Sequence, residues 1–258
     1  KRQTYGDLCD KAKEFSEALP YRTLIFILAE NCNGALLGYI SALSNGVVPL
    51  IISNNTEQSL FDTLYGKYQP EFLWLPTNKI AGFNLKDTLY STNGYSLVRT
   101  GFDTPNLYED LSLLLPTSGS TGSPKLVRHS YRNIEANAEN VMNLFGLTSS
   151  ERAMAALPMH YTMGLSVIAS HLYAGATLLL CGKSLLDPVF WNMLRDGATS
   201  FTGVPYSFEL LAKLRFFRMN LPELKIITQG GGKLTEDMWL QLSSYAINNG
   251  KRFIATYG

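Results

Sequence analysis

The chain has 258 residues, of which 46% are hydrophobic and 17% charged, and its formal net charge is +1. This composition provides a sizeable core and excludes an intrinsically disordered chain. The near-neutral charge argues against nucleic acid as the main partner, and the apolar runs fall short of the ~20 residues that span a bilayer. Neither the three cysteines nor the three histidines have a metal-like spacing, so we expect no structural metal site and reduced thiols in a cytoplasmic protein.

Strands and helices alternate along the first half of the chain. Apolar runs of strand length lie at residues 23–29, 47–53, 71–75 and 111–116. A small-residue helix is predicted at residues 33–45, closed by Gly46. A second helix of about ten residues is predicted before Pro70, with Asn55 and Gln58 as a capping box. The signals between residues 78 and 104 are weaker and indicate short strands and loops.

The second half continues the alternation. Ser130 is a good N-cap for a helix whose apolar face is formed by Ile134, Ala138, Val141 and Phe145. Further strands are predicted within residues 176–181, 199–205, 224–232 and 252–258, and further helices at residues 189–195, 206–214 and 235–247. Such alternation predicts an α/β fold with mainly parallel sheets covered by helices on both faces.

Glycine-containing turns follow several of the predicted strands. The stretches are "TSGSTG", "GVP", "QGGG" and "YG". In parallel sheets ligands bind outside the carboxyl ends of the strands. If the strands share one edge, these turns are expected to converge on one cleft.

The stretch "TSGSTGSPK" at residues 117–125 combines hydroxyl side chains, glycines and a lysine. Gly119 and Gly122 allow the backbone to approach a ligand closely, and successive N–H groups with Lys125 can bind an anion. Leu126 follows the lysine, so the Walker A pattern, which needs a serine or threonine there, is absent. A solvent-exposed Ser/Gly loop is the alternative that the loop's composition leaves open.

Taken with its context of apolar strand, short strand and capped helix, this stretch resembles the adenylate-forming (AMP-binding) superfamily of acyl-CoA synthetases and related adenylation domains. The stretches "GALLGYISALSNGVVPLI", "LPMHYTMGLS", "TGVP", "QGGGKL" and the final "YG" extend the resemblance over nearly the whole chain. It implies two mainly parallel β-sheet sublobes flanked by helices, in the layered αβαβα arrangement of an acyl-CoA synthetase N-terminal domain. One sublobe would span roughly residues 20–155 with the phosphate loop, and the other roughly 160–258 plus the N-terminal helix.

The resemblance also implies an activity and a set of site residues. Members of this superfamily are nucleotide-binding ligases that use ATP to convert a carboxylic acid to an acyl-adenylate, which then usually reacts with a thiol. The β- and γ-phosphates of ATP would be held by Thr117, Ser118, Gly119, Ser120, Thr121, Gly122 and Lys125. The purine would lie on Gly230, Gly231, Gly232, Tyr257 and Gly258. The carboxylate pocket would be shaped by His160, Tyr161, Gly164, Leu165, Val204, Pro205 and Gln229. Lys125 and Tyr161 are the candidate catalytic residues.

Two aspects of the resemblance bear on the activity of this chain. Many relatives have a histidine where Tyr161 stands, and here His160 precedes it, which leaves open which side chain faces the carboxylate. The family's Mg²⁺ ligand and its mobile C-terminal lobe would lie beyond residue 258, so we expect a truncated domain that lacks full activity alone.

The acceptor of the acyl group and the class of protein also stay open. CoA is the favoured acceptor, and an adenylation domain that loads the phosphopantetheine of a carrier protein is the alternative. The stretch "LPMHYTMGLS" contains no aspartate, which argues against an amino-acid substrate. A degenerate nucleotide-binding or interaction protein is the alternative from another class.

Three other features have an ordinary structural interpretation. His129 and His171 are expected to serve in packing and hydrogen bonding. The basic and aromatic stretch "KLRFFR" at residues 213–218 is expected to be an exposed helix end rather than a partner surface.

Overall fold

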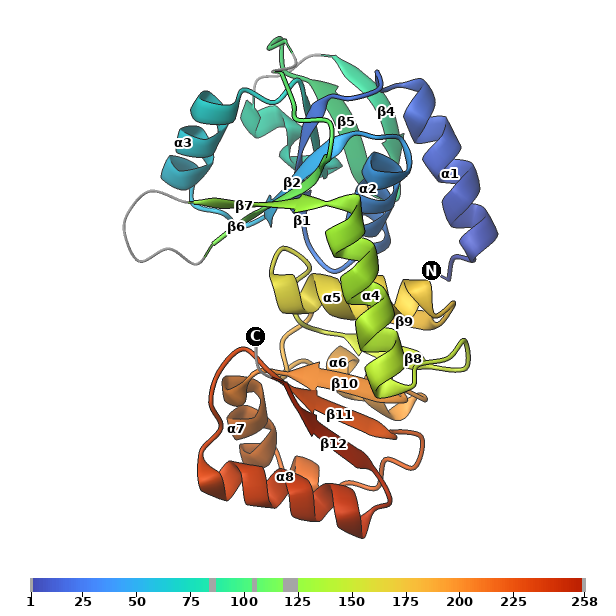
Figure 1. The fold of residues 1–258 in the computed structure, drawn as a ribbon. Helices are drawn as coiled ribbons and strands as arrows, with labels where there is room; N and C mark the ends of the chain where they lie inside the picture. Colours follow the sequence, from blue (N-terminus) through green and yellow to red (C-terminus); the bar gives the residue numbers. More distant parts are fainter. Residues whose placement is uncertain (1, 84–86, 104–105, 118–124, 257–258) are drawn as a thin grey trace. The chain divides into compact units, whose positions relative to one another are not determined.

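A computed structural model describes residues 2–83, 87–103, 106–117 and 125–256 of the chain (Figure 1). The residues divide into two compact units, each with one β-sheet. The first unit comprises Lys1–Ile134 and Met159–Tyr161, and the second comprises Glu135–Pro158 and Thr162–Gly258.

The first unit is built on a seven-stranded sheet with the order β4-β5-β3-β1-β2-β6-β7. The strands are β1 (Leu24–Ala29), β2 (Val48–Ser53), β3 (Phe72–Pro76), β4 (Thr88–Thr92), β5 (Tyr95–Arg99), β6 (Leu111–Pro116) and β7 (Leu126–Ser130). The four central strands β3, β1, β2 and β6 pair in parallel. The antiparallel pairs β3–β5, β4–β5 and β6–β7 lie toward the edges. The sequence prediction of a mainly parallel sheet is therefore confirmed, and the weak segment before residue 104 does contain two short strands.

Continuous apolar sequence explains the central strands of this sheet. All residues of β1 and β3 are buried, and so are all residues of β2 except the last. Parallel strands are covered on both faces, so both alternating sets of side chains must be apolar. Phe26, Leu50 and Leu73 from three adjacent strands meet in one hydrophobic cluster with Phe61 of α3 (Gln58–Tyr68).

The helices of the first unit are α1 (Tyr5–Glu17), α2 (Asn33–Ser44), α3 and the start of α4 (Tyr131–Phe145), with a 3-10 segment η1 (Thr77–Phe83). Ser130 is confirmed as the N-cap of α4, because its Oγ accepts a hydrogen bond from the Asn133 N–H (3.3 Å). The capping box at Asn55 is wrong, because α3 begins at Gln58 after Glu57, which makes no side-chain cap bond.

The N-terminal helix belongs to the first unit, which corrects its expected grouping with residues 160–258. The reason is aromatic packing on α1. Phe15 is fully buried and contacts Trp74 of β3 edge to face, with the ring centroids 4.8 Å apart. Tyr90 of β4 also donates a hydrogen bond to Glu14 (2.8 Å).

The second unit contains a five-stranded sheet in the order β12-β11-β10-β8-β9, and every pairing in it is parallel. The strands are β8 (Arg152–Ala155), β9 (Thr177–Leu180), β10 (Ser200–Gly203), β11 (Ile226–Gln229) and β12 (Arg252–Ala255). Its helices are α5 (Thr162–Tyr173), α6 (Pro188–Arg195), α7 (Pro205–Lys213) and α8 (Glu236–Asn248), with the 3-10 turn η2 (Phe216–Arg218) after α7. Thr235 caps α8, because its side chain accepts from the Met238 N–H (3.3 Å).

The boundary between the units differs from the predicted one near residues 155–160. Strand β8 belongs to the second unit because it pairs with β9 and β10, for example Ala153 with both Leu178 and Ser200. No strand was predicted at β8, because it is only four residues long and contains two alanines, a residue type depleted in strands. Conversely, the short segment Met159–Tyr161 groups with the first unit.

Candidate functional site

Two turns and the end of a third strand lie at the carboxyl edge of the second sheet. Strands β10, β11 and β12 are adjacent and parallel, so Gly203, Gln229 and Ala255 end at the same level. The Gly230 N–H donates to the Gly203 oxygen (3.2 Å), and the Thr256 N–H donates to the Gln229 oxygen (2.7 Å). The predicted convergence of "GVP", "QGGG" and the end of the last strand therefore holds within this unit. Tyr257 and Gly258 lie outside the described residues.

The glycine turn after β11 is shaped by close contacts that leave no room for a side chain at Gly230. A Cβ on Gly230 would lie 1.9 Å from the Met163 Cε and 2.5 Å from the Thr256 Oγ1. Gly231 adopts a positive φ of +74°, which side chains other than glycine rarely take. The sequence therefore needs glycine at these two positions for steric reasons, and the backbone of the turn stays accessible at Gly231 and Gly232, which are exposed.

Val204 and Pro205, which the resemblance assigns to the carboxylate pocket, border this turn. A Cβ on Gly231 would lie 3.2 Å from the Val204 Cγ1, and one on Gly232 would lie 3.2 Å from the Pro205 Cγ. Val204 is the N-cap residue of α7 and Pro205 its first residue, a position that suits proline because no intrahelical donor is lost. The N-terminus of α7, with its partial positive charge, thus lies beside the turn.

Helix α5 brings the second half of the stretch "LPMHYTMGLS", beginning with Thr162, to the same unit as this edge. Met163 fills the space over Gly230. Gly164 is buried, and a Cβ on it would lie 2.2 Å from the Pro158 oxygen and 2.7 Å from the Leu157 oxygen. Leu165 is only 5% exposed and therefore packs into the unit. Met163 and Thr256 are contacts that sequence reasoning missed, although the glycine run itself signals a close neighbour.

The first unit carries the other predicted residues, beginning with the two ends of the segment 117–125 that is expected to hold phosphates. Strands β6 and β7 form a hairpin, and the Thr117 N–H donates to the Lys125 oxygen (2.8 Å) to close its neck. Both residues are exposed. Residues Ser118, Gly119, Ser120, Thr121 and Gly122 lie outside the described residues. The hairpin thus fixes both ends of the loop.

His160 and Tyr161 lie together on the Met159–Tyr161 segment of the first unit. Their ring centroids are 4.4 Å apart, and Tyr161 is 53% exposed. The segment is held by Asn31, just after β1, whose side-chain oxygen accepts from the Met159 N–H (3.0 Å). The buried His160 Nδ1 has no hydrogen-bond partner among the described residues. Burial lowers the pKa of His160, so its ring is neutral at pH 7.

The other two histidines differ: His171 is hydrogen-bonded, whereas the buried Nε2 of His129 has no hydrogen-bond partner among the described residues. His171 is buried, its Nδ1 lies 2.8 Å from the Val167 oxygen, and its Nε2 lies 3.2 Å from the Ser200 Oγ. Because a carbonyl only accepts, Nδ1 carries the proton and Nε2 accepts from Ser200. His171 thus ties α5 to β10. Burial lowers the pKa of His129, which lies on β7.

The stretch "KLRFFR" lies away from the carboxyl edge. Helix α7 starts at that edge with Pro205 and ends at Lys213, followed by η2. Nine helical residues rise by about 13 Å. Phe216 is buried and packs on Tyr245 of α8 (5.1 Å between centroids), while Arg215 and Arg218 are exposed. The expectation of an exposed helix end therefore fits the packing.

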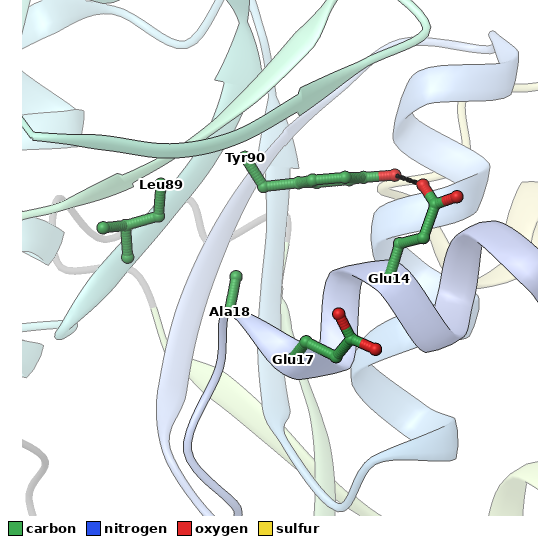
Figure 2. Close-up of a pocket in the computed structure, with 5 residues that line it drawn as sticks. All are labelled: Glu14, Glu17, Ala18, Leu89 and Tyr90. Carbon is green, nitrogen blue, oxygen red and sulfur yellow. Dashed lines mark hydrogen bonds between the residues drawn. The ribbon is translucent and has the colours of Figure 1, made fainter.

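Two surface hollows of the first unit involve none of the predicted site residues. Figure 2 shows a hollow of about 510 Å³ beside α1 and β4, lined by Glu14, Glu17, Ala18, Leu89 and Tyr90. A second, of about 520 Å³, is lined by Ser16, Leu19, Tyr21, Leu43, Ser44, Asn45, Gly46 and Tyr131. Both are wide open to solvent, so they lack the enclosure of a typical small-molecule site.

The described residues contain neither a metal-binding cluster nor a membrane-spanning helix. Among them, no group of three or more histidine, cysteine, aspartate or glutamate side chains could hold a metal ion. No helix in this part of the chain has the length and apolar character needed to cross a bilayer.

Known proteins with similar sequence and structure agree on one family. The family model described as "AMP-binding enzyme" matches residues 1–258. Feruloyl-CoA synthase of an Amycolatopsis species is 31% identical over 160 residues, covering 60% of this chain and 31% of that protein. The 2-succinylbenzoate–CoA ligase of Escherichia coli K12 is 24% identical over 259 residues, covering 98% of this chain and 53% of that protein.

A solved structure supports the fold independently. The crystal structure of ATP-bound MatB from Rhodopseudomonas palustris superposes with a TM-score of 0.79 at 20% identity, covering 98% of this chain and 54% of that one. The chain thus spans about half the length, or less, of the relatives that it matches. Because the family model covers every residue from 1 to 258, the chain belongs to the AMP-binding enzyme family.

Proposed function

We propose that the protein activates a carboxylic acid with ATP to an acyl-adenylate and then transfers the acyl group to CoA. The observation that carries this proposal is the glycine turn at the carboxyl edge of a fully parallel sheet, in a chain that matches the AMP-binding family throughout. Gly230 is closely packed, and the backbone of Gly231 and Gly232 is exposed without side chains. Such a bare backbone surface suits a flat ligand such as a purine. Two relatives with CoA-ligase activity in their names favour CoA as the acceptor.

In the second unit, the proposed role of the glycine turn is to lie along the purine. Gly230, Gly231 and Gly232 offer peptide edges without side chains, and Tyr257 and Gly258 would complete this surface. Val204, Pro205, Gly164 and Leu165 would shape the adjacent acyl pocket. The N-terminus of α7 favours negative charge nearby, which suits a carboxylate or phosphate.

In the first unit, the proposed role of the hairpin loop is to hold the β- and γ-phosphates through Thr117, Ser118, Gly119, Ser120, Thr121, Gly122 and Lys125. The ammonium group of Lys125 would stabilise charge on the phosphoryl oxygens. Tyr161 is exposed, so its hydroxyl can donate a hydrogen bond to the reacting carboxylate, and the neutral His160 lies against its ring. Lys125 and Tyr161 are therefore the proposed catalytic residues.

The proposed reaction needs no covalent bond to the protein. The carboxylate oxygen attacks the α-phosphorus, and the bond to the β-phosphate oxygen breaks to release pyrophosphate. The thiol sulfur, having lost its proton, then attacks the acyl carbon and AMP leaves. The chain's task is to orient the reactants and stabilise charge. Mg²⁺ is expected to accompany ATP, and no step is assigned to it because the described residues include no acidic cluster that fits it.

The chain on its own is proposed to be less active than the whole protein. The relatives that it matches are about twice as long or longer, so groups outside residues 1–258 would contribute to catalysis. A location in the cytoplasm stays a prediction from the sequence.

The test follows acid-dependent exchange of labelled pyrophosphate into ATP across fatty, aryl, hydroxy and amino acids, with the whole protein. Exchange with one class of acid is expected, and Lys125→Ala should slow it at least about tenfold because a charge-assisted contact is lost. Lys67→Ala is the matched control, since Lys67 is an exposed lysine on α3 whose ammonium lies over the Tyr68 ring (5.2 Å to the centroid). No exchange with any acid, despite ATP binding, would favour a degenerate nucleotide-binding protein.

The acceptor is tested separately once an acid is known. Thioester formation is measured with CoA and with a phosphopantetheine-bearing carrier protein as competing acceptors. The proposal expects acyl-CoA as the main product. Loading of the carrier protein alone would instead assign the chain to the adenylation domains that serve such carriers.

A further inference from the structure

Gln229 ends strand β11 and is 3% exposed, so its amide is enclosed by its own turn. The side-chain nitrogen Nε2 donates to the Gly232 oxygen (2.7 Å) and to the Gly230 oxygen (3.2 Å). The orientation of the amide is fixed by chemistry, because a flipped amide would place its oxygen against two carbonyl oxygens. Both donor positions of the amide nitrogen are therefore used within the turn.

The backbone of Gln229 is also fixed. Its carbonyl oxygen accepts from the Thr256 N–H (2.7 Å) and from the Thr256 Oγ1 (2.9 Å). The next residue, Gly230, donates its N–H to Gly203 (3.2 Å) on the adjacent strand. The turn is thus held at its start by the sheet and across its top by the Gln229 side chain.

The hydrogen bonds of Gln229 decide where two peptide N–H groups point. In a trans peptide the carbonyl and the following N–H point in opposite directions. Because the carbonyls of Gly230 and Gly232 point toward the Gln229 amide, the N–H groups of Gly231 and Lys233 point away from it. Gly231, Gly232 and Lys233 are exposed, so these donors lie on the accessible side of the turn, where the acceptor edge of a purine can meet them.

We infer that Gln229 is a positioning residue for the nucleotide: it orients the Gly230–Gly232 turn toward the purine and does not contact the carboxylic acid. This inference rests on the proposed function and replaces the assignment of Gln229 to the carboxylate pocket. It predicts that changes at Gln229 affect ATP and leave the acid unaffected.

The test compares Michaelis constants in the whole protein. Gln229→Met keeps the length of the side chain and removes both donors. It should raise the KM for ATP about tenfold, equivalent to about 1.4 kcal/mol, with the KM for the acid unchanged within about twofold. Thr228→Val is the control, because Thr228 is equally buried on the same strand but faces the other side of the sheet. It should leave both constants unchanged.

A second variant gives a pH signature. Gln229→Glu keeps the shape of the side chain but places a carboxylate against two carbonyl oxygens. At pH 8 the KM for ATP of Gln229→Glu should be higher than that of Gln229→Met, which is itself higher than that of the wild type. At pH 6 the ratio to wild type should fall, because a protonated carboxyl group can again donate one hydrogen bond. A loss of folding alone would not produce this recovery.

Several results would overturn the inference. A rise in the KM for the acid with ATP unaffected would place Gln229 in the acyl pocket, and no change in either constant would remove any role in binding. If no acid supports exchange in the wild type, the proposed function fails, but the inference is still tested by calorimetry with ATP alone. In that measurement, an unchanged Kd for ATP in Gln229→Met would refute the inference, whereas a Kd raised about tenfold would support it.

Discussion

Gly230→Ala is the substitution whose effect follows most directly from the geometry. The added methyl group would lie 1.9 Å from the Met163 Cε and 2.5 Å from the Thr256 Oγ1. Gly230 is not at a positive φ, so steric overlap and not backbone strain sets the cost. Overpacking of this kind costs about 1–3 kcal/mol. A loss of about 2 kcal/mol should lower the Tm by about 4–8 °C for a protein of this size.

The assay is thermal unfolding, with a second substitution to relieve the overlap. Met163→Ala removes the nearer of the two contacting atoms, so Gly230→Ala should cost less in the Met163→Ala background than in the wild type. The matched control is Gly66→Ala in α3, where an added Cβ would meet nothing within 4 Å. Since alanine favours a helix more than glycine does, this control should raise stability by about 0.5–1 kcal/mol.

Two results would refute this reasoning. An unchanged Tm for Gly230→Ala would show that the turn accommodates a side chain, and the glycine would then have no steric cause. Equal costs of Gly230→Ala in both backgrounds would show that Met163 does not press on the turn. Either result would also weaken the proposal that the turn approaches a ligand closely.

Three further predictions concern other parts of the two units. Gly164→Ala should destabilise the protein at least as much as Gly230→Ala, because its Cβ would lie 2.2 Å from the Pro158 backbone oxygen. Backbone atoms move less easily than a flexible side chain. A smaller change in the urea midpoint than that of Gly230→Ala would contradict this. Burial lowers the pKa of His171 below its ordinary 6.5, so the free energy of unfolding should decrease as the pH falls below about 6.5, where the unfolded chain binds the proton more readily. Urea unfolding at pH 7.5 and 5.5 checks this. The difference in unfolding free energy between the two pH values should be smaller in His171→Gln than in the wild type. Asn31→Leu should cost about 1–3 kcal/mol by leaving the Met159 N–H without its acceptor, and Asn31→Asp, which keeps an acceptor, should retain more stability in the same assay.

The sequence determined the fold class and most of the elements because their signals are local. Continuous apolar runs such as residues 24–29 and 48–52 read as buried parallel strands, and they are. Ser130 and Thr235 identify helix starts by side-chain chemistry that acts over three residues. The motif order also sufficed to place the chain in its family, which the family model confirms over its full length.

The errors arise where a local signal was weak or ambiguous. Strand β8 has four residues and becomes a strand by pairing with β9 and β10. Asn55 looked like a helix cap, but its backbone N–H instead donates to the Ser53 Oγ (3.1 Å). Polar residues of this kind form turns as readily as caps.

Only the tertiary structure decided which distant residues meet. Helix α1 joins the first unit because Phe15 packs on Trp74, a contact between residues 59 positions apart in the chain (74 − 15). Gly230 must be glycine because Met163 and Thr256 occupy the space around it, and the sequence does not reveal which neighbour excludes a side chain. Gln229 illustrates the difference best. Its position beside three glycines can be seen in the sequence. That its side-chain amide bonds to the carbonyls of its own turn follows from burial, because an amide removed from water must bond to the carbonyls within reach.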